Sequence, residues 1–372
     1  MQIKNRSKNF YFRYNLICFG FRSRFKSRFK SRFKSGFSSG LHSIYKSVSP
    51  SLYAKQIKAL MMLVLLSCAM IMTVASAAVR ADDVLPNVSD GKLQRLDAQA
   101  LPFELIKPRP IDVWLPEDYP AKAPYAVVYM HDGKVLYDAN QSWNGTAWEV
   151  DETAASLNKS KDIKPFIVVG IHNAEQSRHS EYFPQKPFES LTADTQTSLY
   201  QTQRNATEKL LAQAVYSDKY AKFIVTVLKP YIDEHFKVAT DKQNTFIMGS
   251  SMGGLISWYT ALEYPQVFGG AACLSTHWPG SFAAEDNPIP QVFNQYLAKQ
   301  IATNPQVKLY FDYGDQTLDA MYPPLQAEVD KLFETSGYDK ALWQTHFFKG
   351  KAHNESDWAE RLNIPMTFLL GK

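Results

Sequence analysis

The segment Gly249–Gly253 places a serine between two glycines in the pattern G-x-S-x-G. A short run rich in β-branched and aromatic residues precedes it (244–248), and residues 254–264 are typical of a helix that ends before Pro265. A serine on such a sharp strand-to-helix turn is an exposed nucleophile, and the glycines let the backbone pass close to it. N–H groups at the start of the helix can then stabilise an oxyanion. The pattern predicts acyl-transfer chemistry at Ser251, with a glycine-rich turn and a bystander serine as the alternative.

A serine nucleophile needs a general base, and one histidine follows the last predicted strand. His353 comes after the strand expected at 342–348 and before a final helix expected from about Glu355. Where the nucleophile stands on a strand-to-helix turn of this kind, the acid and then the histidine follow the serine along the chain. We therefore predict His353 as the base. The alternatives are His277, His131 and His172, each near the end of another predicted strand.

Three aspartates lie between Ser251 and His353, close to the end of the strand that begins at Lys308. Asp312 is expected on the strand or at its end, and Asp315 follows a glycine and suits a turn. Asp319 lies on a loop long enough to reach back to the imidazole. An acid in this position fixes the histidine tautomer and stabilises the imidazolium. We predict Asp319 as the acid, with Asp315 and Asp312 as alternatives.

The elements that must position these residues alternate between strands and helices. Further strands are expected at 111–115, 125–130, 166–171, 270–274 and 308–312, and helices at 145–157, 217–232 and 325–335. Strands that are nearly all apolar and alternate with helices indicate an α/β fold with a mainly parallel sheet and helices on both faces. The polar segment 172–216 is expected to be irregular and to cross the active-site face.

The beginning of the chain differs in composition from the rest. Residues 1–77 hold 14 Lys and Arg but no Asp or Glu, and Ser-Arg-Phe-Lys occurs three times between Ser23 and Lys34. We expect 1–58 to be a basic low-complexity segment, disordered if it is translated, and the simplest interpretation is a gene start placed too far upstream. A nucleic-acid or membrane-binding arm is the alternative.

Residues 59–78 have the pattern of an export signal. Two lysines precede an apolar run that ends in Ala75-Ser76-Ala77, which is typical of a signal-peptide cleavage site. Residues 79–372 are then expected to form a single exported domain, periplasmic or secreted, with a lipoprotein anchored at Cys68 as the alternative.

Removal of the signal changes the charge of the protein. The remaining chain has 27 Lys and Arg against 36 Asp and Glu, a net charge of −9 compared with +5 for the whole chain. We therefore expect no nucleic-acid partner. After cleavage Cys273 is the one remaining cysteine, so no internal disulfide is expected, and its small apolar neighbours predict a packing role.

One set of motifs extends over nearly all of 111–370: Tyr129–Lys134, Trp143, Trp148, Val169–Ile171, Arg178, Glu181, Tyr182, Gly249–Gly254, Phe311–Gly314, Leu318, Asp319, His353 and Trp358. As a set these motifs resemble the "putative esterase" family, which includes enterochelin-esterase-like proteins, esterase D relatives and mycolyltransferases. The resemblance implies an α/β-hydrolase fold and an oxyanion hole made by the backbone N–H groups of Met252 and Lys134. Some relatives carry the acid as G-x-x-D, where this chain has Thr317, so the sequence departs from that pattern at the acid.

The predicted reaction is hydrolysis of a carboxylic ester. Ser251 attacks the carbonyl, His353 takes and returns the proton, and Asp319 orients His353. An acyltransferase that uses the same triad with a sugar or lipid alcohol, and a catalytically dead binding protein, are the alternatives. The expected partner is a small-molecule, glycan or siderophore ester. No metal or cofactor is expected, since no cluster shows ligand spacing.

The segment 172–216 contains further candidates for substrate binding. We expect Arg178 to pair with Glu181 and tie this segment down, and binding of an anionic substrate group is the alternative. Aromatic side chains in and near the segment suit either a substrate or packing: Tyr182, Phe183, Phe188 and Phe282.

Overall fold

The computed structural model describes residues 61–62, 84–97, 101–102, 104–283 and 286–372. The chain divides into two compact units, Met1–Arg80 and Ala81–Lys372. Apart from Met61 and Met62, which are helical, the predicted segments 1–58 and 59–78 lie outside the described residues. Within the described ranges, no helix has the length and apolar character needed to cross a membrane.

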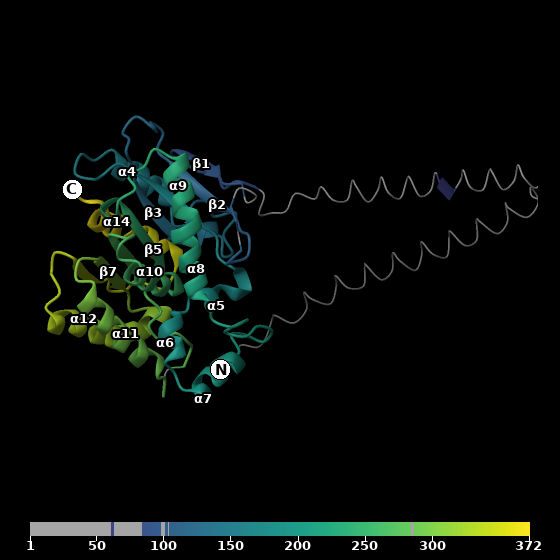
Figure 1. Cartoon of the computed structure of the whole chain (residues 1–372), viewed down its shortest axis with the longest axis vertical. Coiled ribbons are helices and arrows are strands. Elements are labelled where there is room, and N and C mark those ends of the chain that lie inside the picture. The colour runs from purple at the N-terminus through teal and green to yellow at the C-terminus, as the bar shows by residue number, and fades with distance from the viewer. Residues whose placement is uncertain (1–60, 63–83, 98–100, 103, 284–285) are drawn as a thin grey trace, which may run out of the picture. The chain divides into compact units, whose positions relative to one another are not determined.

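An eight-stranded sheet forms the centre of the second unit (Figure 1). Its strands are β1 (Lys92–Arg95), β2 (Ile111–Leu115), β3 (Ala126–His131), β4 (Phe166–Ile171), β5 (Thr245–Ser250), β6 (Gly270–Leu274), β7 (Lys308–Tyr313) and β8 (Trp343–Phe347). Their order is β1-β2-β4-β3-β5-β6-β7-β8. Strands β1 and β2 are antiparallel to their neighbours, and all pairings from β4 to β8 are parallel. The predicted mainly parallel sheet is confirmed.

Helices cover both faces of this sheet. They are α4 (Val150–Asn158), α5 (Arg178–Tyr182), α6 (Gln185–Glu189), α7 (Ala193–Gln201), α8 (Ser217–Phe223), α9 (Lys229–His235), α10 (Met252–Glu263), α11 (Ile289–Thr303), α12 (Tyr322–Ser336), α13 (Glu355–Ala359) and α14 (Asn363–Leu370). A π-helical turn, Ile224–Leu228, joins α8 to α9. Helix α4 begins five residues later than predicted, because Gly145 and Glu149 both have positive φ and interrupt helical geometry.

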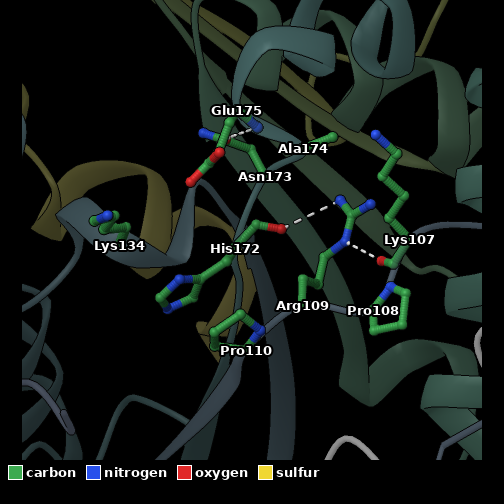
Figure 2. A pocket seen from close by; sticks show the side chains of 9 residues that line it. All are labelled: Lys107, Pro108, Arg109, Pro110, Lys134, His172, Asn173, Ala174 and Glu175. Carbon is green, nitrogen blue, oxygen red and sulfur yellow. Dashed lines mark hydrogen bonds between the residues drawn. The ribbon is translucent and has the colours of Figure 1, made fainter. Parts of the chain in front are cut away.

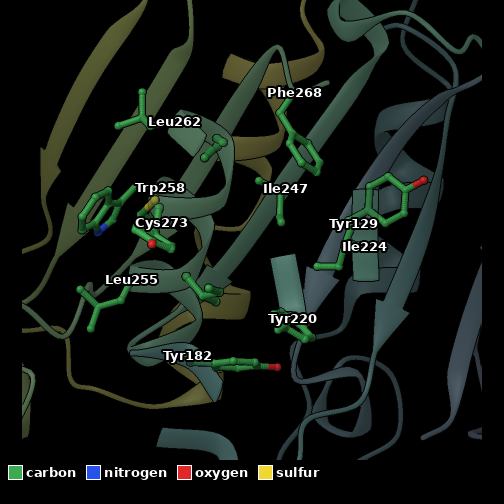
Figure 3. Close-up of a cluster of buried hydrophobic side chains, with 14 of the residues drawn as sticks. Tyr129, Tyr182, Tyr220, Ile224, Ile247, Leu255, Trp258, Leu262, Phe268 and Cys273 are labelled. Atoms are coloured by element: carbon green, nitrogen blue, oxygen red, sulfur yellow. The ribbon is translucent and has the colours of Figure 1, made fainter. Parts of the chain in front are cut away.

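Side chains alternate between two cores along the central strands. Tyr129, Ile247 and Cys273 point into the core shared with α8 to α12 (Figure 3). Their neighbours Val128 and Met248 point into the core shared with α4 and α14. Because both faces are buried, each central strand is nearly all apolar, which is why the sequence pattern identified them. Cys273 is buried and unpaired, as its neighbours predicted.

The segment 172–216 is less irregular than its polarity predicted, since most of 178–201 is helical and only 202–216 is a stretch without a helix or strand. It contains three helices, α5 to α7, and Tyr182, Phe183 and Phe188 are buried in the core on the α8 side. These helices are five to nine residues long, so their few apolar residues give no extended helical period. These three aromatic residues therefore pack in the core and do not line an open surface.

The sheet has a topological switch between β3 and β5. Strand β3 is followed by α4 on one face of the sheet, and β5 is followed by α10 on the other. In open α/β sheets the loops at the carboxyl ends of strands on either side of such a point diverge and leave a crevice. Residues after β3 and β5 therefore meet at the edge where a ligand can bind.

Candidate active site

Ser251 stands on the turn between β5 and α10 with a strained backbone. Its φ is 57° and its ψ is −121°, outside the regions that non-glycine residues usually adopt. Its backbone N–H donates to the carbonyl of Leu274 at 2.9 Å, which ties the turn to the adjacent strand β6. A Cβ at Gly249 would lie 2.9 Å from the carbonyl carbon of Gly253, so both glycines are required for the close approach. This geometry explains the G-x-S-x-G pattern and exposes Ser251 at the carboxyl edge.

His353 pairs with Asp319 at the same edge of the sheet. The Nδ1 atom of His353 lies 2.6 Å from Oδ1 of Asp319, and the carboxyl group is completely buried. The other carboxyl oxygen accepts hydrogen bonds from the Ser275 hydroxyl at 2.6 Å and from the Gly314 N–H at 2.7 Å. Both oxygens of Asp319 therefore have hydrogen-bond partners, which fix the orientation of the carboxyl group relative to the imidazole.

The loop that carries His353 is held on two sides. Its backbone N–H donates to Oγ1 of Thr317 at 2.9 Å, and the ring lies edge-on to Trp358 with centroids 4.9 Å apart. The ring of Tyr322 lies on a third side, with its centroid 5.8 Å from that of the imidazole. The hydroxyl of Tyr322 lies 2.9 Å from Nδ1 of His277.

The two other aspartates of this region lie elsewhere. The carboxylate of Asp315 is at the surface and accepts from the Gly350 N–H at 2.7 Å. Asp312 is buried, where it meets Arg361 at 2.9 Å and the N–H of Ser275 at 3.1 Å. The structure therefore brings Asp319, and not these two, to His353.

The three alternative histidines have other partners. Nδ1 of His131 lies 2.8 Å from the hydroxyl of Tyr220, and Nε2 of His172 lies 3.0 Å from the buried Asp112. Nδ1 of His277 lies 2.9 Å from the hydroxyl of Tyr322, and its backbone N–H donates to the carbonyl of Ser251 at 3.2 Å. Burial lowers the pKa of His131 and of His277 to about 3, so both rings are neutral at pH 7.

The loop after β3 lies beside the start of α10. A Cβ at Gly253 would be 3.3 Å from Oδ2 of Asp132, whose own backbone is left-handed with φ 59°. Lys134 follows in the 3₁₀ turn Gly133–Val135 and lines a surface cavity of about 240 Å³ (Figure 2). Met252 is the first residue of α10, where backbone N–H groups lack intrahelical acceptors. The segments carrying the two expected oxyanion donors are therefore adjacent.

The expected ion pair between Arg178 and Glu181 is wrong. Arg178 instead donates from Nε and Nη2 to the two carboxyl oxygens of Asp132, both at 2.7 Å, while Glu181 is buried against Arg109. A bidentate pair with a carboxylate held in a fixed loop is stronger than a pair one turn apart on a five-residue helix. Arg178 therefore fastens the loop that carries Lys134 to α5.

Two exposed aromatic residues lie on loops around these groups. Phe282 is about half exposed, and its ring contacts those of His179 and His277. Trp143 is 81% exposed, and its neighbour Asn144 donates to Glu355 at 2.7 Å, two residues beyond His353. Of the aromatic residues weighed from the sequence, Phe282 is the one that stays accessible.

Sequence reasoning did not find Ser275 or Tyr322. Ser275 is the first residue after β6, the strand next to β5. A polar residue at the carboxyl end of that strand could have indicated a site residue from the sequence. Tyr322 begins α12 within the sequence Tyr-Pro-Pro, and no pattern there points to chemistry.

A family model and a curated protein match this chain. A family model described as "Putative esterase" matches residues 104–367. The uncharacterized protein YbbA of Bacillus subtilis (strain 168) is 27% identical over 172 residues, a match that covers 46% of this chain and 58% of that protein. The chain thus spans less than two thirds of this curated relative.

Two solved structures share the fold. A ferulic acid esterase superposes with a TM-score of 0.52 at 17% identity, covering 75% of this chain and 97% of that one. An IroE-like serine hydrolase from Shewanella oneidensis superposes with a TM-score of 0.51 at 16% identity, covering 74% and 77%. At these identities the likeness concerns the α/β-hydrolase fold.

Proposed function

This chain belongs to the putative esterase family, and we propose that it is a serine hydrolase that cleaves a carboxylic ester through Ser251, His353 and Asp319. One observation carries the proposal: the 2.6 Å pairing of His353 with the fully buried Asp319, at the edge of the sheet where Ser251 stands on its strained turn. Nucleophile, acid and base follow one another along the chain in the order typical of this fold.

In the first half of the reaction, His353 acts as general base. Its Nδ1–H is directed at Asp319, so its Nε2 carries the lone pair that can accept the proton of Ser251. The serine oxygen bonds to the ester carbon, and the imidazolium returns the proton to the departing alcohol. The buried carboxylate stabilises that imidazolium without taking its proton.

The negative charge on the carbonyl oxygen is assigned to the N–H groups of Met252 and Lys134. Support comes from the start of α10 and from the contact between Gly253 and the loop after β3. Two backbone donors aimed at the developing oxyanion can lower the barrier by several kcal/mol, about 3 kcal/mol for a single well-placed donor. The Arg178–Asp132 pair would keep this loop in position.

In the second half, water replaces the alcohol. His353 takes a proton from the attacking water and gives it to the oxygen of Ser251 as the acyl-enzyme breaks down. The result is a carboxylic acid and the free serine.

Active-site labelling tests this proposal. Wild-type protein is incubated with a fluorophosphonate probe and assayed on p-nitrophenyl esters of increasing chain length. We expect labelling at Ser251 and turnover of at least one ester, both lost in Ser251→Ala and kept in Ser250→Ala, the neighbouring serine on β5. Labelling that persists in Ser251→Ala would contradict the proposal.

We also propose that the protein is exported, on the basis of the sequence of residues 59–78, most of which lie outside the described part of the structure. Expression of the chain from Met61 should give a mature protein that starts at Ala78 or Val79, as read by N-terminal sequencing. Palmitate labelling that depends on Cys68 would instead identify a lipoprotein.

A further inference from the structure

One buried histidine near the nucleophile turn has no part in the proposed triad. His179 lies on α5, and only 4% of it is exposed. Among the described residues, neither Nδ1 nor Nε2 of its ring has a hydrogen-bond partner. A buried polar group that stays unpaired lowers the stability of the fold, so packing alone does not account for a histidine at this position.

His277 links His179 to the nucleophile turn. The two imidazoles lie edge to face, with their centroids 6.3 Å apart. The backbone N–H of His277 donates to the carbonyl of Ser251 at 3.2 Å, and its Nδ1 lies 2.9 Å from the hydroxyl of Tyr322. The ring of Tyr322 in turn lies beside that of His353. His179 is therefore one side chain away from residues that contact the nucleophile turn and the base.

Phe282 connects His179 with the surface. The centroid of its ring lies 6.2 Å from that of His179 and 5.9 Å from that of His277, while its side chain is about half exposed. An apolar part of a substrate can pack on this exposed ring while a polar atom reaches the imidazole beside it. The two hydrogen bonds from Arg178 to Asp132 hold α5 in place, so His179 is positioned before a substrate binds.

The protonation state of His179 limits the kind of group that it can bind. Burial lowers the pKa of its ring well below the ordinary value, so the imidazole is neutral at pH 7 and carries one donor and one acceptor. A hydroxyl both donates and accepts, so it can pair with either nitrogen. A carboxylate can only accept and an ammonium group can only donate, and each would bring a charge into a buried site beside a neutral ring. The ring is therefore suited to a hydroxyl group.

We propose that His179 is a specificity-determining residue, whose imidazole binds a hydroxyl group of the ester substrate while Phe282 packs against the part of the substrate that carries it. The inference rests on the proposed esterase function and names the substrate group that the site selects. An ester without the hydroxyl leaves the imidazole unpaired in the complex, so it is cleaved more slowly. A hydroxyl on the acyl side and one on the alcohol side have the same chemistry, and the experiment distinguishes them.

Two pairs of esters that differ by one hydroxyl test this preference. Ethyl phloretate and ethyl hydrocinnamate differ on the acyl side, and the aliphatic acetate of tyrosol and phenethyl acetate differ on the alcohol side. The readout is the ratio of kcat/KM for the hydroxylated ester to that for its partner. An ester that is not cleaved is measured as a competitive inhibitor of p-nitrophenyl acetate hydrolysis. We expect wild-type protein to prefer the hydroxylated ester of one pair by about 10- to 100-fold.

Substitutions of His179 connect this preference to the ring. In His179→Leu the ratio should fall to within about threefold of one, and the urea midpoint should rise because an unpaired buried group is removed. His179→Gln keeps one donor and one acceptor and should retain part of the preference. His235→Leu is the matched control, since it removes an exposed imidazole at the end of α9 that contacts the carbonyl of Tyr231, and its ratio should equal that of wild type.

A wild-type ratio near one in both pairs would overturn the inference, and so would a preference that His179→Leu retains in full. In either case turnover of p-nitrophenyl acetate and labelling of Ser251 by the fluorophosphonate would leave the esterase proposal standing. If wild-type protein cleaves no ester and Ser251 is not labelled, the esterase proposal fails and this inference falls with it.

Discussion

Replacement of Asp319 by asparagine changes the hydrogen-bonding pattern at the proposed acid while leaving its shape almost unchanged. The carboxylate meets Nδ1 of His353 on one oxygen, and accepts from Ser275 and the Gly314 N–H on the other. An amide has one oxygen and one NH₂ group, so only one side can keep its acceptor. The structure determines which side that is.

If the NH₂ group faced Gly314, two donors would oppose each other and a buried backbone N–H would lose its partner, at a cost of about 1–3 kcal/mol. The NH₂ group is therefore expected to face His353. The ring must then accept at Nδ1 and carry its proton on Nε2, so it cannot take the proton of Ser251. Only the minor orientation of the amide, with its oxygen toward His353, leaves the ring in the active tautomer, which accounts for about a 10- to 100-fold loss of kcat. Loss of the charge that stabilises the imidazolium brings the total expected drop in kcat to about 10⁴-fold.

The assay is steady-state hydrolysis of p-nitrophenyl acetate by Asp319→Asn, with urea unfolding as a check on the fold. Asp315→Asn is the matched control, since its carboxylate is at the surface and bonds to Gly350 and Gln316. It should stay within about threefold of wild type. A kcat within tenfold of wild type for Asp319→Asn, or a large loss confined to Asp315→Asn, would refute the assignment of the acid.

Two further predictions concern the turn that carries Ser251 and the buried His131. Gly249→Ala places a Cβ 2.9 Å from the backbone of Gly253, so the turn must shift, and we expect kcat/KM for p-nitrophenyl acetate to fall about 100-fold with the protein still folded; a change below threefold would show that the turn has room. Burial holds the pKa of His131 at about 3 in the folded protein, against about 6.5 in the unfolded chain, so the unfolded state binds more protons between these values and stability falls as pH falls through that window. Between pH 7 and pH 5 this histidine should lower the free energy of unfolding of the wild-type protein by about 2 kcal/mol, and this loss should be absent in His131→Asn. An equal change in the free energy of urea unfolding in both proteins would contradict the prediction.

The fold could be predicted largely because its strands are buried on both faces. Strands β2, β4 and β6 have the predicted ends, since a strand that is buried on both faces is a nearly continuous apolar run. Strand β1 was missed because its four residues are only partly buried and polar at three positions. The three helices of 172–216 were missed because each is too short to show a helical period.

The site residues that depend on local sequence or chain order could be predicted, and those that depend on contacts between distant segments could not. Ser251 was recognisable because its glycines are a local steric requirement, and His353 and Asp319 because chain order limits where they can stand; their catalytic roles stay predictions. The partner of Arg178 could not be read from spacing, since Asp132 lies 46 residues away and competes with a nearer carboxylate. The contact of Tyr322 with His277 depends on how the loops after β6 and β7 are arranged in space, and no sequence motif indicates it.

The central claim is that Ser251 carries the acyl group during turnover. Wild-type protein mixed with p-nitrophenyl acetate and quenched in acid should show, by peptide mass spectrometry, one acetyl group on the peptide that contains Ser251, and fragmentation should place it on that residue. His353→Ala, treated for the same time, should show almost none. An acetyl group on another residue, or turnover of the ester by wild-type protein with no modified peptide at any quench time, would contradict the account.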